Sequence, residues 1–134
     1  MKTGIMKVGI QDSQVMKIVK SKIIPLPGFA ACNLFGVLFC RPRTYDRIQR
    51  GYNKTLINHE EIHTAQMKEL LYLPFYILYL IFWIIRVVTP PFETSYRDIS
   101  FEQEAYDNER NLDYMNARKH YSWVRYMFRS SNKE

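Results

Sequence analysis

The chain has 134 residues, the length of one domain, and 47% of them are hydrophobic, enough to build a core without stabilising cross-links. Its only cysteines, Cys32 and Cys40, are too few for a disulfide framework and lack the CxxC spacing of zinc ribbons, so we expect two buried free thiols. The net charge of +6 suits anionic partners, but no nucleic-acid-binding motif accompanies it. We therefore expect a solvated basic surface and no specific nucleic-acid partner.

The N-terminal part of the chain predicts a small sheet. Residues 1–20 are polar, contain no apolar stretch of the kind that signal peptides have, and are expected to be loosely ordered. Between Ile23 and Cys40 the chain becomes apolar and rich in Phe and Val, which predicts one or two short strands, with Asn33 and Gly36 as turn or bulge residues. The absence of a signal-like stretch favours a cytoplasmic location, including the inner face of a membrane.

The rest of the chain predicts helices, and the whole is expected to be a single α+β domain over residues 1–134. Residues 41–53 read as a loop, and Asn53 or Thr55 is a suitable N-cap for the helix that follows. Ser100 and Gln103 have the spacing of a capping box. The predicted helices run from about Thr55 to Glu69, Pro74 to Val88, Phe101 to Lys119 and Ser122 to Phe128.

The first of these helices carries the sequence HEEIH, residues 59–63. Because residues four apart lie about 40° from each other on a helix, His59 and His63 can reach one metal ion. Glu60 then points to the same opening, where it can hold a zinc-bound water and act as general base. The alternative is a pair of ordinary histidines on a helix.

A catalytic zinc ion takes three protein ligands and keeps one position open, so a third ligand is needed. The segment SFEQEAYDNE, residues 100–109, is the most evident source. Glu102 and Glu104 point to faces about 160° apart on a helix, so only one of them can be the ligand. Glu102 shares its face with Ala105, Tyr106 and Glu109.

This pair of motifs resembles the gluzincin class of zinc metallopeptidases, which join His-Glu-x-x-His to a later helix with Glu-x-x-Ala-Asp. Over residues 20–125 the chain is also similar to a family of small gluzincin-like proteins found in Bacteroidetes, with the pattern FE-x-EAY-x-NE. The resemblance implies a gluzincin-like helical core, makes Glu102 the third zinc ligand, and places the small Ala105 against the first helix. It also implies that an edge strand beside the active-site helix, here within NLFGVLF, pairs with extended substrate.

The chain departs from the peptidase pattern at Tyr106, where the class has an Asp that orients a zinc-bound histidine. Asp107 and Asp113 are alternative partners for that histidine. His120 is a rival third ligand, as in metallopeptidases that use three histidines.

Leu70 to Val88 is a 19-residue apolar run with one charge, Arg86, long enough to span a membrane. Its tyrosines and Trp83 nevertheless form a stripe along the whole helix, whereas a helix surrounded by lipid keeps such residues mainly at its ends. A buried central helix and a membrane-associated helix are both open.

The sequence therefore predicts a zinc-dependent metallopeptidase that hydrolyses peptide bonds in a peptide or protein substrate. His59, His63 and Glu102 bind Zn²⁺, and Glu60 is the catalytic acid and base. The alternative is a non-catalytic, zinc-stabilised scaffold that binds a protein partner or a membrane through residues 70–88.

Overall fold

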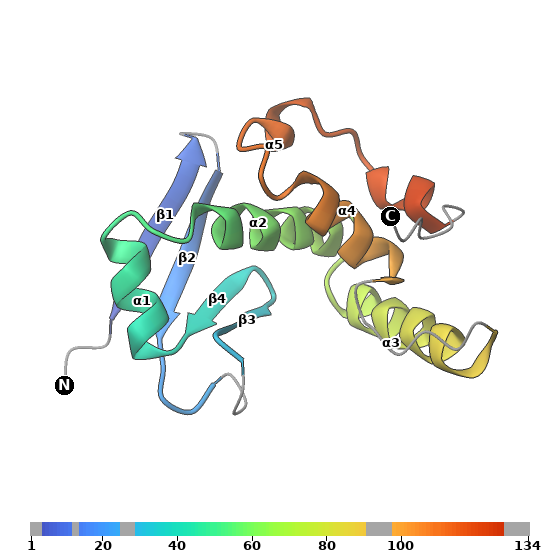
Figure 1. Cartoon of the computed structure of the whole chain (residues 1–134), viewed down its shortest axis with the longest axis horizontal. Coiled ribbons are helices and arrows are strands. Elements are labelled where there is room, and N and C mark those ends of the chain that lie inside the picture. The colour runs from blue at the N-terminus through green and yellow to red at the C-terminus, as the bar shows by residue number, and fades with distance from the viewer. Residues whose placement is uncertain (1–3, 12–13, 25–28, 91–97, 128–134) are drawn as a thin grey trace.

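The computed structural model describes residues 4–11, 14–24, 29–90 and 98–127, and it has the expected α+β architecture, with a small N-terminal sheet followed by helices (Figure 1). The sheet contains β1 (Ile5–Gln11), β2 (Gln14–Lys20), β3 (Ala31–Leu34) and β4 (Val37–Cys40). Their order is β1-β2-β4-β3, with β2 and β4 parallel and the other pairs antiparallel. The expectation of a loosely ordered N-terminus was wrong for the residues that form β1 and β2.

The β3–β4 hairpin places an edge strand beside the helices. Its two-residue turn, Phe35 and Gly36, has positive φ at both positions (53° and 87°), the geometry whose twist matches the flanking strands. A Cβ on Gly36 would lie 3.3 Å from Cγ2 of Thr64, so glycine also permits the hairpin to approach α2 (Lys54–Glu69) closely. Asn33 tightens this contact, because its Nδ2 donates to the Glu60 carbonyl and to Oγ1 of Thr64.

The helices predicted over residues 55–69 and 74–88 agree closely with α2 and α3 (Leu73–Val88) of the structure. Besides these two, the structure has α1 (Pro42–Gln49), α4 (Ser100–Asn108), α5 (Tyr114–Ala117) and the 3-10 helix η2 (Ser122–Met127). The loop predicted over residues 41–53 was wrong, because Pro42 fits the first turn of α1 and a buried face formed by Thr44, Tyr45 and Ile48 holds that helix. Asn53 is the N-cap residue of α2, without a side-chain capping bond.

The helix predicted over residues 101–119 was also wrong, since α4 ends at Asn108. The fully buried Asn58 of α2 explains the break, because its Nδ2 donates to the carbonyls of Asn108, Glu109 and Asn111. The capping box predicted from Ser100 and Gln103 was also wrong. Ile99 is the N-cap residue of α4, and the Gln103 side chain donates to the Asp98 carbonyl instead.

The core has two clusters, and α2 contributes to both of them. One cluster joins the sheet and α1 to Ile57 of α2, and the other joins Met67 of α2 to α3, α4 and η2 around Phe101. Figure 1 shows α2 running between the sheet and α4. This helix can therefore present side chains to a site between the two halves of the domain.

The apolar run 70–88 does not form one helix. Leu71 and Tyr72 have positive φ, and α2 and α3 meet there at an angle of 109°. Of the residues in α3, only Phe75 is buried, so of the two alternatives left open by the sequence, the buried central helix was wrong. In the described part of the chain, no helix alone has the length and apolar character to cross a bilayer, although the bent α2–α3 pair passes that test together.

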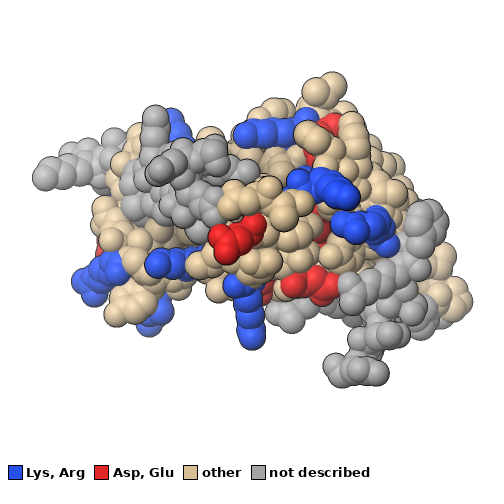
Figure 2. Space-filling model, turned by 90° about the horizontal axis from the view of Figure 1, so that it is seen from above, with Lys and Arg blue, Asp and Glu red and all other residues tan. Residues whose placement is uncertain are grey.

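Charge is spread over the surface. On the face shown in Figure 2, Lys and Arg side chains are scattered and acidic side chains lie among them. Arg118, expected on a solvated basic surface, is instead a buried ion-pair partner of Glu69 and Glu104. The thiols are free as expected, with Cys40 buried and Cys32 half-buried.

Candidate metal centre

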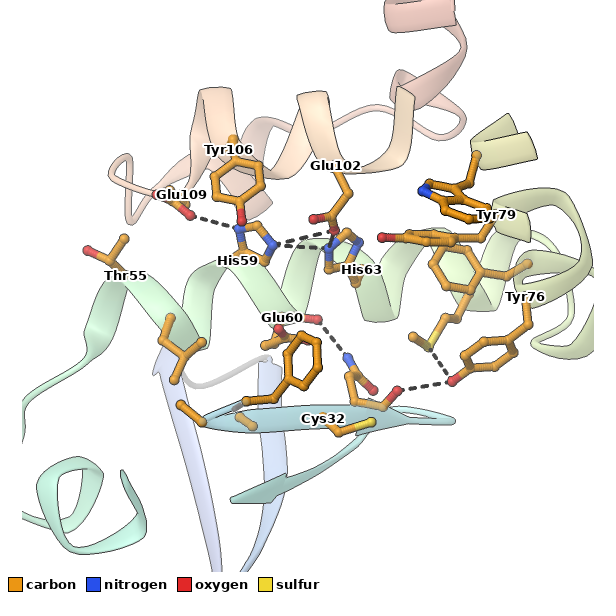
Figure 3. Close-up of a pocket in the computed structure, with 18 of the residues that line it drawn as sticks. Cys32, Thr55, His59, Glu60, His63, Tyr76, Tyr79, Glu102, Tyr106 and Glu109 are labelled. Atoms are coloured by element: carbon orange, nitrogen blue, oxygen red, sulfur yellow. Dashed lines mark hydrogen bonds and ion pairs between the residues drawn. The ribbon is translucent and has the colours of Figure 1, made fainter. Parts of the chain in front are cut away.

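The structure brings together the three side chains that were predicted to bind metal. His59 and His63 lie one turn apart on α2, Glu102 lies on the facing side of α4, and all three are buried (Figure 3). Their potential ligand atoms all lie within 4.8 Å of one another. The Nε2 atoms of the two histidines are 3.1 Å apart, and Oε1 of Glu102 is 3.6 Å from Nε2 of His59 and in contact with Nε2 of His63.

Two of these three separations are close to those between ligands of a tetrahedral zinc ion. Ligands that lie 2.0–2.1 Å from a tetrahedral centre are about 3.3 Å from each other. The Nε2–Nε2 separation of 3.1 Å and the His59–Glu102 separation of 3.6 Å lie on either side of that value, whereas the contact between Glu102 and His63 is closer than two ligands of one zinc ion would be. Two imidazoles and one carboxylate are also a donor set that catalytic zinc sites use.

The outer nitrogen of His59 has a carboxylate partner. Oε2 of Glu109, the C-cap residue of α4, about two turns beyond Glu102 and one turn beyond Tyr106, lies 2.7 Å from Nδ1 of His59. A carboxylate at this distance accepts a hydrogen bond from Nδ1–H, which leaves the lone pair of a neutral imidazole on Nε2. Tyr106 packs its ring against the same imidazole, with the centroids 4.6 Å apart.

The outer nitrogen of His63 has an amide partner, Oε1 of Gln66, at 2.8 Å. Nδ1 therefore carries the proton here too, and the lone pairs of both Nε2 atoms face each other. Two lone pairs 3.1 Å apart repel each other unless a cation lies between them, and a shared metal ion supplies one. Without metal, a proton can take that place. Burial alone would lower the pKa of His63, but the charge of Glu102 raises it to about 9.

The pKa of Glu102 is shifted in the opposite direction from that of His63. Burial alone would raise the pKa of Glu102, but the charges and hydrogen bonds of His63 and His59 lower it to about 2. The carboxylate is therefore ionised at neutral pH and ready to bind a cation.

Glu60 lines the same pocket as the three ligands, between their cluster and strand β3 (Figure 3). Burial raises the pKa of its carboxyl, although His63 and His59 oppose this effect. A raised pKa suits a carboxylate that must take up a proton near neutral pH and release it again.

The pocket has a volume of about 880 Å³ and is mainly apolar. Strand β3 forms one wall through Ala31, Cys32 and Asn33, and aromatic residues of α3 form another, including Tyr76, Tyr79 and Trp83. Tyr76 fastens α3 to the hairpin, because its hydroxyl donates to the Asn33 carbonyl and accepts from Phe35 N. In Figure 3 the hydroxyl of Tyr79 points toward His63.

The rival ligand and the rival partners lie elsewhere. The side chain of His120 is 89% exposed and lies beside Glu69, away from the ligand cluster. Asp107 and Asp113 are exposed. Glu109 was placed on the correct face from its helical spacing, but its role toward His59 was missed. The role of Gln66 was missed too, although a residue three positions after His63 lies on the same side of the helix.

No family model, curated protein or solved structure matches this chain. Function is therefore inferred from the residues of the site.

Proposed function

We propose that the protein is a zinc-dependent metallopeptidase, in keeping with its resemblance to gluzincins. The observation that carries the proposal is the buried cluster of His59, His63 and Glu102, whose possible ligand atoms lie within 4.8 Å of one another, beside the half-buried Glu60 in one open pocket. A structural zinc site would be closed by a fourth protein ligand. Among the described residues, only His59, His63 and Glu102 form a cluster with metal-binding geometry.

Each residue of the site has a role in this proposal. Zinc would supply Lewis acidity, which lowers the pKa of water and polarises a carbonyl group. His59, His63 and Glu102 would hold the ion, and Glu109 and Gln66 would orient the two imidazoles. Glu60 would take the proton from the attacking water and pass it to the leaving amine.

The walls of the pocket suit an extended peptide. Among the described strands, β3 is at the edge of the sheet and pairs only with β4, so a substrate strand could add to its other side. The aromatic residues of α3 would receive an apolar side chain next to the scissile bond. We assign the Tyr79 hydroxyl as the donor to the oxyanion, because it points toward His63 in Figure 3.

The test is cleavage of a peptide library by zinc-loaded protein, read by mass spectrometry. Wild type should cleave next to apolar residues, and Glu60→Gln should bind zinc but lose cleavage. Glu61→Gln is the matched control, because Glu61 is the neighbouring buried carboxylate and does not line the pocket. Equal cleavage by wild type and Glu60→Gln would contradict the proposal.

A second candidate function is attachment to an anionic membrane surface through α3. The helix exposes a continuous aliphatic stripe at helical spacing, formed by Leu73, Ile77, Leu80, Ile81, Ile84, Ile85 and Val88. No acidic residue occurs between Glu69 and Glu93, while Lys68 and Arg86 lie near the two ends of the helix. Exposed apolar stripes flanked by basic residues suit anionic lipid.

The length of α3 favours binding along the surface. Its 16 residues span about 24 Å, less than the ~30 Å of a hydrocarbon core. Vesicle flotation tests this directly. Wild type should float with anionic vesicles, and Leu80→Glu combined with Ile84→Glu should not. If the wild type does not float with vesicles but forms concentration-dependent dimers through this stripe, lipid attachment would be contradicted.

A further inference from the structure

A buried polar network lies behind His63, on the side away from the pocket. Its members are Gln66 on α2, Glu104 on α4, and Arg118 just after α5, and the first two are completely buried. Nε2 of Gln66 donates to Oε2 of Glu104 at 2.7 Å and to the Phe101 carbonyl at 2.9 Å. Both partners are acceptors, so the orientation of the Gln66 amide is fixed: Oε1 must face Nδ1 of His63.

Glu104 is itself held by charge-assisted bonds. Arg118 Nε lies 2.7 Å from Oε1 of Glu104, and its Nη2 lies 3.2 Å from Oε2. The same Nη2 donates to Oε1 of Glu69 at 2.8 Å, and the Tyr114 hydroxyl donates to Oε1 of Glu104. Burial alone would lower the pKa of Arg118, but its bonds to Glu69 and Glu104 raise it, so the guanidinium stays charged.

A buried network of this kind is not the most stabilising way to fill a core. Removing the charged side chains of Glu104, Arg118 and its second partner Glu69 from water carries a desolvation penalty, and apolar residues of similar volume often stabilise a core equally well. A function for the network is therefore worth seeking. The chain of contacts His63–Gln66–Glu104–Arg118 ends at a residue already proposed to bind metal.

We propose that Gln66, oriented by Glu104 and Arg118, is a positioning residue that keeps the proton of His63 on Nδ1 and the lone pair of Nε2 on the metal. This inference rests on the proposed zinc site. It assigns the two histidines different partners: a carboxylate holds His59, and a neutral amide fixed by a buried ion pair holds His63. An amide acceptor orients the ring without adding a third negative charge near Glu60 and Glu102.

Two substitutions of Gln66 separate this role from a merely structural one. Gln66→Leu and Gln66→Glu both remove the hydrogen bonds that the amide nitrogen donates to Phe101 and Glu104. Only Gln66→Glu keeps an oxygen acceptor for Nδ1 of His63, although it places a second carboxyl beside Glu104. A structural role predicts that the variant with the greater loss of stability also binds zinc more weakly, whereas positioning predicts that Gln66→Glu binds zinc more tightly than Gln66→Leu.

The experiment measures zinc affinity by competition with a chromophoric chelator, and the absorption spectrum of the cobalt-substituted protein. Gln66→Leu should lose about 10- to 100-fold in affinity and change the cobalt spectrum, the size of effect seen when such partners are removed. Ile62→Val is the matched control, because it trims a fully buried residue of α2 that lies outside the pocket and the network. It should keep the affinity and the spectrum of the wild type.

Glu104→Gln offers a second test with nearly unchanged shape. It removes the charge that pairs with Arg118 while keeping an oxygen that can accept from Gln66, so its loss of affinity should be smaller than that of Gln66→Leu. Wild-type affinity and spectrum in a folded Gln66→Leu, or weaker binding by Gln66→Glu than by Gln66→Leu, would overturn the inference and leave the zinc site standing. No zinc binding by the wild type would overturn both.

Discussion

His59 and His63 differ in the groups that hold their outer nitrogens, and this difference governs the site at the scale of single residues. The carboxylate of Glu109 contacts Nδ1 of His59, which would fix the plane of the imidazole and make it a stronger ligand for the proposed zinc ion. Tyr106, which stands where the gluzincin pattern has an Asp, packs against the ring instead. The role that the resemblance gives to the Asp is thus open to Glu109, about two helical turns after Glu102 and one turn after Tyr106.

We predict that Glu109→Ala weakens zinc binding by about 10- to 100-fold, because Nδ1 of His59 loses its acceptor. Chelator competition measures this loss. Asp107→Ala, an exposed carboxylate on the same helix, is the control and should bind zinc as the wild type does. Unchanged affinity in Glu109→Ala would mean that Glu109 does not support His59.

Zinc binding should also depend steeply on pH. In the metal-free protein the pKa of His63 is raised to about 9, so zinc must displace a proton at neutral pH. The apparent affinity should therefore rise about tenfold per pH unit below pH 9 and level off above it. Calorimetry in buffers of different ionisation enthalpy should detect one released proton at pH 7. Flat affinity between pH 6.5 and 9 would contradict this.

His63 and Glu102 also make the stability of the metal-free protein depend on pH. The pKa of His63 is raised from 6.5 to about 9, so its contribution is fully present below pH 6.5 and is lost as the pH rises through 9. The pKa of Glu102 is lowered from 4.5 to about 2, so its contribution is present above pH 4.5 and is lost as the pH falls through 2. Both contributions are complete between pH 4.5 and 6.5.

At the scale of elements, α2 and α3 could be predicted because their signals are local: a long apolar periodicity, and Pro74 in the first turn of α3. The break after α4 could not, because it depends on a tertiary contact, the bonds from Asn58 to three carbonyls. Helix α1 was missed because its sequence is mostly charged, and its short buried face becomes evident only when the helix is seen packed on the sheet. The candidate ligands could also be named from the sequence: His59 and His63 from their spacing on one helix, and Glu102 through the resemblance to gluzincins.

The packing of α4 against α3 and η2 gives a prediction at this scale. Phe101 is fully buried, and its ring centroid lies 4.7 Å from that of Phe75 and 4.8 Å from that of Trp123. Phe101→Ala should lower the free energy of unfolding by about 3–5 kcal/mol, measured by urea denaturation of the metal-free protein. Leu80→Ala, on the exposed face of α3, should change it by only about 0.5 kcal/mol. Similar losses in the two variants would contradict the packing described.

At the scale of the whole molecule, α2 joins the two halves of the domain. Its residues pack against the sheet on one side and against α3 and α4 on the other, and its histidines face Glu102 of α4. A metal ion at this place would connect α2 to α4 as the buried network of Gln66, Glu104 and Arg118 does. The aliphatic stripe of α3 remains exposed beside the pocket, and Leu80 belongs to both.

The central claim is that His59, His63 and Glu102 bind one zinc ion, and elemental analysis tests it most directly. The protein should be purified without a metal-affinity column, as the wild type and as Glu102→Ala, His59→Ala and Glu60→Gln. We predict about one zinc per chain in the wild type and in Glu60→Gln, and little in the two ligand variants. A wild type that holds no zinc, even after reconstitution, would contradict the claim and leave residues 59–63 as part of an ordinary helix.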